Sequence, residues 1–143
     1  MILLDTNVVS ELVKASPHET VIAFIGAHEA EVTYISAVTA GELRFGIALL
    51  PIGRRREALD RAVEQMLAID FRHRVLPFDV SAARAYAEIA ASRRRMGRPM
   101  GMADAQIAAI ARVHGAALAT RNVRDFDACG ISVVNPWDAS VTE

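Results

Sequence analysis

The sequence predicts a three-layer α/β fold in which helices flank a mainly parallel central sheet. Short apolar runs alternate with longer amphipathic stretches along the whole chain, which is the pattern of repeated strand and helix units. Apolar residues make up 52% of the 143 residues and charged residues 23%, so the chain has the composition of a globular protein with a packed core. At this length a single domain spanning residues 1–143 is expected.

The individual elements follow from the spacing of apolar residues. Strands are expected where short apolar runs are bounded by turn residues, at 2–4, 32–35, 75–78, 116–119 and 131–134. Helices are expected where apolar residues recur every three or four positions, at 17–27, 36–50, 55–68, 79–95 and 103–113. Pro17, Ser36 and Asp79 can open three of these helices, Thr39 is a second possible cap beside Ser36, and Gly115 ends the last helix.

Composition excludes several classes of protein. No run approaches the ~18 apolar residues that a membrane-spanning helix needs, so no membrane association is expected. The first residues contain no basic region and no cleavage site typical of an export signal. Cys129 is the single cysteine and cannot form an internal disulfide, which favours a reducing, cytoplasmic location.

Positive charge is concentrated in the middle of the chain. Residues 53–98 carry eleven arginines against six acids, a local net charge of +5 in a protein whose total is −1. Arginine contacts phosphate oxygens in pairs, so a polyanion such as RNA is a reasonable partner for this segment. The alternative is that the arginine runs at 54–56 and 93–95 are ordinary solvated helix faces.

Three acids occupy positions that are unusual for a purely structural role. Asp5 follows the first strand, where open α/β sheets form their ligand crevice, although it could simply cap a short helix beginning near Val8. Glu42 shares a helical stripe with Val38, Phe45 and Leu49, which predicts that it lies along the apolar face.

The third acid, Asp104, lies in the first turn of its helix on the stripe of Ile107, Ala108 and Ala111. Capping offers an alternative for both helical acids, since Thr39 and Glu42 have the spacing of a capping box and Asp104 is close to a helix start.

Converging carboxylates repel one another unless a cation neutralises them. Hard oxygen ligands favour Mg²⁺, for which Mn²⁺ commonly substitutes, and the four scattered histidines do not have the spacing of a zinc site. Magnesium held by a few carboxylates takes phosphate oxygens as further ligands, so phosphate chemistry is the expected use.

Four motifs resemble those of PIN-domain ribonucleases. They are residues 1–7 (MILLDTN), residues 40–43 (AGEL) with Gly46, residues 103–109 (ADAQIAA), and residues 119–122 (ATRN) followed by Asp125-Phe126 and Asn135-Pro136-Trp137. Their order and spacing are closest to the VapC-type toxins of toxin–antitoxin pairs, in particular the FitB-like branch. The resemblance covers essentially the whole chain.

The resemblance implies an acidic metal site at Asp5, Glu42 and Asp104, with Asp5 and Asp104 as the direct Mg²⁺ ligands. Many relatives carry a further aspartate directly after the Thr-Arg pair, where this chain has the uncharged Asn122. Asp125 could replace it from the same loop, or could cap the turn.

Three other polar residues are candidate supports for the acids through hydrogen bonds: Thr6, Asn7 and Thr120. Ordinary turn and capping chemistry is an equally good explanation for each of them.

The function implied is that of a Mg²⁺-dependent endoribonuclease toxin, in which metal-activated water hydrolyses RNA and Glu42 orients or deprotonates that water. The implied partners are RNA, a VapB-like antitoxin and a second copy of the chain, with operator DNA bound only through the antitoxin. One alternative is a degenerate PIN-like module that binds RNA or protein without cutting. Another is a haloacid-dehalogenase-like phosphatase with Asp5 as nucleophile, which Asn7 disfavours because that chemistry needs a second acid there.

Overall fold

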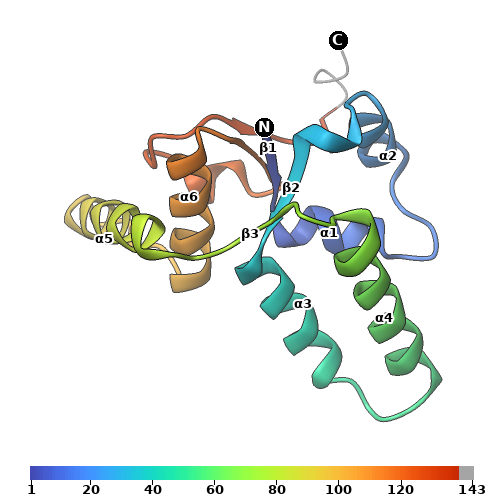
Figure 1. Cartoon of the computed structure of the whole chain (residues 1–143). Helices are drawn as coiled ribbons and strands as arrows, with labels where there is room; N and C mark the ends of the chain where they lie inside the picture. Colours follow the sequence, from blue (N-terminus) through green and yellow to red (C-terminus); the bar gives the residue numbers. More distant parts are fainter. Residues whose placement is uncertain (139–143) are drawn as a thin grey trace.

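Five parallel strands form the centre of the computed structural model, which describes residues 1–138 (Figure 1). The predicted domain of residues 1–143 includes 139–143, which lie outside the described residues. The strands are β1 (Ile2–Leu4), β2 (Thr33–Ser36), β3 (Val75–Leu76), β4 (Ala117–Ala119) and β5 (Val133–Val134). All four pairings are parallel and the order is β3-β2-β1-β4-β5, so the predicted fold class is confirmed.

Six α-helices connect and cover the strands: α1 (Thr6–Leu12), α2 (Glu19–Gly26), α3 (Ala37–Ala48), α4 (Arg54–Gln65), α5 (Val80–Arg95) and α6 (Met102–His114). Two 3-10 turns, η1 (Ala30–Val32) and η3 (Val123–Phe126), and a π-helical turn, η2 (Met66–Asp70), complete the elements. In Figure 1, α3 and α4 form a hairpin that projects away from the sheet. Helices α5 and α6 lie side by side and pack on the other face of the sheet. No helix within residues 1–138 has the length and apolar character needed to cross a bilayer.

The sheet separates two apolar cores because neighbouring residues of a strand face opposite sides. Leu3 packs with α5 and α6 in one core, which includes Ile89 and Ile107. Leu4 packs in the other core with residues from α1 to α4, such as Val8 and Leu43. Helices on both faces of a central sheet are the three layers that the alternation of strands and helices predicts.

The strand order reverses direction between β1 and β4. The chain builds β1, β2 and β3 outward on one side and then returns to place β4 and β5 on the other side of β1. Parallel sheets of this kind form their ligand crevice at such a switch point, outside the carboxyl ends of the strands. Asp5 follows β1 and Thr120 follows β4, so both residues lie at this point.

Several predicted boundaries are wrong. The short helix that Asp5 could cap near Val8 is present as α1, and it begins at Thr6. The helix predicted from Pro17 begins at Glu19, because the Nδ1 atom of His18 accepts a hydrogen bond from the Thr20 N–H at 3.2 Å and caps it. The strands predicted at 75–78 and 131–134 shorten to two residues each.

Helix α3 buries a different face from the one predicted. Its buried residues are Thr39, Leu43 and Ile47, whereas Phe45 and Leu49 are 66% and 70% exposed. The helix carries apolar residues around most of its circumference, so spacing alone does not identify the buried stripe. Contacts with α1 and α4 select the stripe that is buried.

The arginine-rich segment is also less uniform than predicted. Arg93 is buried, and its guanidinium donates to the backbone carbonyls of Arg98, Asp125 and Asp127 at 2.8 to 2.9 Å. It therefore cannot contact RNA from this position. Arg94 and its neighbour at position 95 are exposed.

Candidate active site

An acidic pocket of about 450 Å³ lies at the switch point of the sheet. Its walls come from the ends of β1 and β4, from α1, α3 and α6, and from the chain after β5. The residues that line it are Asp5, Thr6, Asn7, Ser10, Glu11, Lys14, Glu42, Asp104, Arg121, Asn122 and Trp137. Six of the eight residues predicted for the site are among them.

Asp5 is buried at the floor of this pocket, with 4% of its surface exposed. Its Oδ1 atom accepts a hydrogen bond from the Thr6 N–H at 2.8 Å, and its Oδ2 atom accepts one from the Thr120 hydroxyl at 2.7 Å. Burial raises the pKa of Asp5, although these two hydrogen bonds act in the opposite direction. Asp5 is the N-cap of α1 and also lines the pocket, so the capping alternative and the site prediction are compatible.

Glu42 lies at the exposed rim of the pocket and not on a buried face. The expectation that it points along an apolar stripe is therefore wrong. The capping-box alternative is wrong as well, because the cap of α3 is Ser36, whose hydroxyl accepts the Thr39 N–H at 3.0 Å. The Oε1 atom of Glu42 instead accepts a hydrogen bond from the Thr6 hydroxyl at 2.6 Å, which holds the carboxylate at the pocket.

Asp104 reaches the pocket from the first turn of α6 and is half-buried. The helix begins after Gly101 and has no side-chain cap, so Asp104 does not serve as one. Burial and the negative charges of Asp5, Glu42 and Asp125 raise the pKa of Asp104 to about 6. The last three contributions show that acids from distant parts of the sequence share one electrostatic environment.

Asn122 and Asp125 occupy different positions relative to the pocket. Asn122 lines it, and its backbone N–H donates to the Thr120 hydroxyl at 3.1 Å. Asp125 is exposed in η3 and does not line the pocket, but its charge contributes to the raised pKa of both Asp5 and Asp104. Asp125 thus acts on the site through its field rather than from its wall.

A hydrogen-bonded network connects the two strand ends beneath the acids. The Thr120 hydroxyl, which donates to Asp5, accepts from the Asn7 side-chain amide at 3.3 Å. The side-chain amide oxygen of Asn7 accepts a hydrogen bond from the backbone N–H of Arg121 at 3.3 Å. On the other side, the hydroxyls of Thr6 and Thr39 are 3.0 Å apart, which connects α1 to α3. Thr6 and Thr120 therefore hold Asp5 and Glu42 in place, and Asn7 supports Thr120.

The basic side chains in the pocket wall have other contacts. Lys14 pairs with Glu11 at 2.6 Å, and this contact lowers the pKa of Glu11. The Arg121 guanidinium lies over the Trp137 ring, 5.1 Å from its centroid. Neither contact brings a cation between Asp5 and Asp104. Burial, together with the negative charge of neighbouring acids, raises the pKa of both carboxyls.

The donor set suits a hard divalent cation that keeps part of its water shell. Each carboxylate oxygen of Asp5 has a free lone pair beyond its hydrogen bond, and Asp104 adds a second carboxylate. Within residues 1–138 no group of three or more acidic, histidine or cysteine side chains lies close enough to form a metal-ligand set by itself. Mg²⁺ does not need one, because it binds through one or two carboxylates and retains several waters.

Five lining residues had no predicted role: Ser10, Glu11, Lys14, Arg121 and Trp137. The first three follow Asn7 by three, four and seven residues, so a helix beginning directly after Asp5 would have pointed to them. Arg121 and Trp137 belong to the motifs that carry the family resemblance, but nothing in their spacing indicates that they meet.

The fold and the site together define the class of this protein. It is an α/β protein with an acidic pocket at the switch point of a parallel sheet. The PIN domain model matches residues 2–130. The VapC ribonuclease Y4jK of Sinorhizobium fredii is 46% identical over 138 residues, which cover 96% of this chain and 99% of that protein. The toxin FitB of Neisseria gonorrhoeae is 42% identical over 137 residues, with coverage of 96% and 99%. The crystal structure of FitAcB from Neisseria gonorrhoeae matches with a TM-score of 0.88 at 42% identity, covering 96% of this chain and 99% of that chain.

The chain belongs to the PIN-domain family, in its branch of VapC and FitB ribonuclease toxins of toxin–antitoxin systems. This membership excludes the phosphatase alternative. It agrees with the position of Asn7, whose side chain bridges the strand ends instead of supplying a second acid.

Proposed function

We propose that the protein is a Mg²⁺-dependent endoribonuclease that acts as the toxin of a toxin–antitoxin pair. The observation that carries the proposal is the convergence of Asp5, Glu42 and Asp104, from β1, α3 and α6, on one pocket. Burial and the negative charges of the neighbouring acids raise the pKa of Asp104 to about 6, and a divalent cation would relieve the repulsion among these carboxylates.

Asp5 and Asp104 would hold the ion directly, and Mn²⁺ would substitute for Mg²⁺ because both prefer carboxylate oxygens. The bound ion supplies Lewis-acid polarisation of the scissile phosphate and lowers the pKa of its water. Thr120 and the Thr6 N–H keep the Asp5 carboxylate in place through their hydrogen bonds. Asn122 adds a neutral amide at the pocket wall, and Asp125 adds negative charge nearby.

Glu42 accepts the proton of the attacking water. Its carboxylate is oriented by the Thr6 hydroxyl at 2.6 Å and lies at the solvent-facing rim, where water enters. The water oxygen forms a new bond to phosphorus, the bond to the leaving sugar oxygen breaks, and that oxygen takes up a proton from solvent. A general base in this position contributes about 10²- to 10⁴-fold to the rate.

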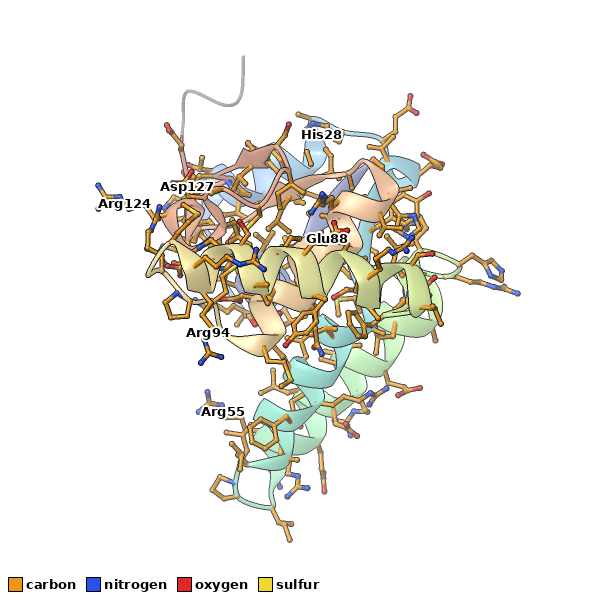
Figure 2. All side chains as sticks on the ribbon, turned by 90° about the vertical axis from the view of Figure 1, so that its left-hand side faces the viewer. His28, Arg55, Glu88, Arg94, Arg124 and Asp127 are labelled. Atoms are coloured by element: carbon orange, nitrogen blue, oxygen red, sulfur yellow. The ribbon has the colours of Figure 1, made fainter. Side chains whose placement is uncertain are left out.

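Exposed arginines hold the RNA backbone. Figure 2 shows Arg124, Arg94 and Arg55, from η3, α5 and α4, one below another on the same side of the molecule. Arg55 also lines an apolar groove that adjoins the acidic pocket. Such phosphate contacts give affinity without sequence choice and weaken steeply with salt.

The antitoxin covers this apolar groove. The groove lies between α1, α3 and α4, has a volume of about 280 Å³ and shares Thr6, Lys14 and Glu42 with the acidic pocket. An amphipathic segment of a VapB-like antitoxin seated there would reach the carboxylates and block RNA. Operator DNA is contacted by the antitoxin and not by this chain.

A second copy of the chain packs on the outer face of α3. Phe45 on α3, and Leu49 and Ile52 in the segment that follows it, are 66%, 70% and 90% exposed, and association would cover these large apolar side chains. The protein acts in the cytoplasm, where its RNA substrate and antitoxin are found.

Calorimetric titration of the antitoxin-free protein with Mn²⁺ tests the metal site. We expect binding by the wild type, loss of that binding in Asp5→Ala and Asp104→Ala, and unchanged binding in Asp60→Ala, which removes an exposed acid of α4. Asn122→Asp should bind Mn²⁺ more tightly, since it adds a charge to the pocket wall.

Cleavage of total RNA with Mg²⁺ tests the activity. Glu42→Gln should lower the rate about 10²- to 10⁴-fold while leaving Mn²⁺ binding within a few-fold of wild type. Wild-type protein that neither binds Mn²⁺ nor cuts RNA would contradict the proposal and favour the non-catalytic binding module.

A further inference from the structure

We propose that Trp137 and Arg121 form a stacking wall that takes an unpaired base of single-stranded RNA next to the scissile phosphate. The inference rests on the proposed ribonuclease function and adds a positioning role for two residues outside the acidic set. It begins from their location, since both side chains line the same pocket as Asp5 and Asp104.

The indole is presented to the pocket on a fixed support. The backbone N–H of Trp137 donates to the side-chain oxygen of Asn135 at 2.9 Å, and Pro136 between them is buried. The half-buried Trp137 ring packs against the core that includes Leu4 and Ala119, the last residues of β1 and β4. An aromatic face beside the strand end that carries Asp5 is therefore available to a ligand.

Arg121 covers this face in the absence of RNA. Its guanidinium lies 5.1 Å from the indole centroid, while its backbone N–H is held by the side chain of Asn7 at 3.3 Å. The backbone of Arg121 is thus fixed, and its exposed side chain is free to turn about that anchor.

RNA can replace this contact favourably. An exposed cation–π contact changes an equilibrium constant by only about 2- to 5-fold. Stacking of a base on an aromatic side chain contributes about 5- to 150-fold. The displaced guanidinium gains a paired, charge-assisted contact with the adjacent phosphate. The bound state, in which a base stacks on the indole and Arg121 contacts the phosphate, is therefore favoured over the Arg121–Trp137 contact of the free protein.

The exchange has a consequence for substrate class. A base can reach the indole face only when it is not paired and stacked in a duplex, so the wall selects single-stranded loops or ends. The acids alone do not provide this selection, because they interact with the phosphate, which is present in every nucleic acid.

Trp137 is the single tryptophan of the chain, so its fluorescence reports on the wall directly. The experiment uses full-length Asp104→Asn protein with Mg²⁺, in which cleavage is not expected, and two labelled probes. One is a short oligoriboadenylate, and the other is a chain of the same length whose residues lack bases. Fluorescence anisotropy of the label measures binding, and tryptophan emission measures stacking.

We expect the oligoriboadenylate to quench the Trp137 emission to saturation, with the same midpoint as the anisotropy change. The abasic chain should bind more weakly and leave the emission unchanged. In the same background Trp137→Leu should weaken binding of the oligoriboadenylate about 5- to 150-fold, and Trp137→Phe should recover most of the loss because it keeps an aromatic face.

Oligoriboadenylate binding with unchanged emission would overturn the stacking wall while leaving the ribonuclease function intact. Equal binding of the two probes would do the same. Absence of binding by either probe would overturn both proposals. The emission measurement needs no substitution in the wall, so it decides the question even if Trp137→Leu does not fold.

Discussion

Asp104 makes the stability of the metal-free protein depend on pH. Its pKa is about 6 in the native state, because of burial and the charges of Asp5, Glu42 and Asp125, whereas the ordinary value is 3.8. Between these values the native state binds more protons than the unfolded chain, so the free energy of unfolding decreases as pH rises. The stabilisation from the protonated carboxyl is complete below pH about 4 and is lost as pH rises through about 6.

Asp104→Asn should remove this part of the pH dependence. In EDTA we expect the Tm of the wild type to fall relative to that of the variant between pH about 4 and 7, and the variant to be the more stable protein at pH 7. Calorimetric unfolding across this range makes the comparison. Mn²⁺ at pH 7 should raise the Tm of the wild type and leave the variant nearly unchanged. Parallel curves for the two proteins would contradict the electrostatic assignment.

Thr120 is the residue on which the polar network beneath the acids depends. It is fully buried, donates to Asp5 and accepts from Asn7 and Asn122. Thr120→Val keeps the shape but removes the hydroxyl, and should lower the free energy of unfolding by about 1–3 kcal/mol. Urea denaturation measures the change. Thr120→Ser, which restores the hydroxyl, should recover most of it, and a Val variant as stable as wild type would show that the network contributes nothing.

Helix α5 ends in three consecutive arginines with different roles. Arg93 connects the end of the helix to the loop that carries Asp125 and Asp127 by donating to their carbonyls. Arg94 is exposed, and Figure 2 shows it on the side of the molecule shared with Arg55. Neighbouring residues of identical chemistry therefore divide between a structural and a surface role.

A pair of substitutions separates these roles. Arg93→Leu should destabilise the fold strongly, because the buried guanidinium donates to three backbone carbonyls, and a carbonyl left without a donor costs about 1–3 kcal/mol. Arg94→Leu should change stability by less than about 0.5 kcal/mol and weaken RNA binding at low salt. Thermal unfolding and filter binding of RNA measure the two effects. The assignment fails if Arg93→Leu is as stable as Arg94→Leu.

At the scale of the whole molecule, the outer face of α3 makes the oligomeric state testable. Phe45 and Leu49 are 66% and 70% exposed, and Phe45→Glu with Leu49→Glu places two charges on the proposed contact between copies. Light scattering should give a dimeric mass for the wild type and a monomeric mass for this double variant. Val80→Glu, at a position that is 87% exposed on α5, should remain dimeric. A wild type that is monomeric at every concentration would overturn the proposed dimer.

Family membership and the outline of the fold could be predicted because both depend on local patterns. Apolar runs that alternate between strand and helix lengths allow few arrangements other than a parallel sheet covered on both faces. Asp5 and Asp104 were identified because each is an acid at a strand end or helix start beside residues that must be buried. The sequence does not show that the Thr120 hydroxyl donates to Asp5 or that the charge of Asp5 acts on Asp104. Only the structure shows these two interactions.

Element boundaries were harder to predict because they depend on individual contacts. The side chain of His18 caps α2 in place of a start at Pro17, and α1 begins at Thr6 because Asp5 accepts its N–H. In each case one hydrogen bond between close neighbours decides the boundary, and several residues in the sequence could have made it.

The sequence by itself determined the fold class, the family and three acids of the candidate site, Asp5, Glu42 and Asp104, since short-range spacing and chemical type carry that information. Only the tertiary structure decided which stripe of α3 is buried, that Arg93 faces inward, and that Arg121 meets Trp137 over the pocket. Each of these outcomes depends on packing between segments far apart in the chain. Periodicity shows that a helix has an apolar face, but where several faces qualify, the neighbouring helices determine which one is covered.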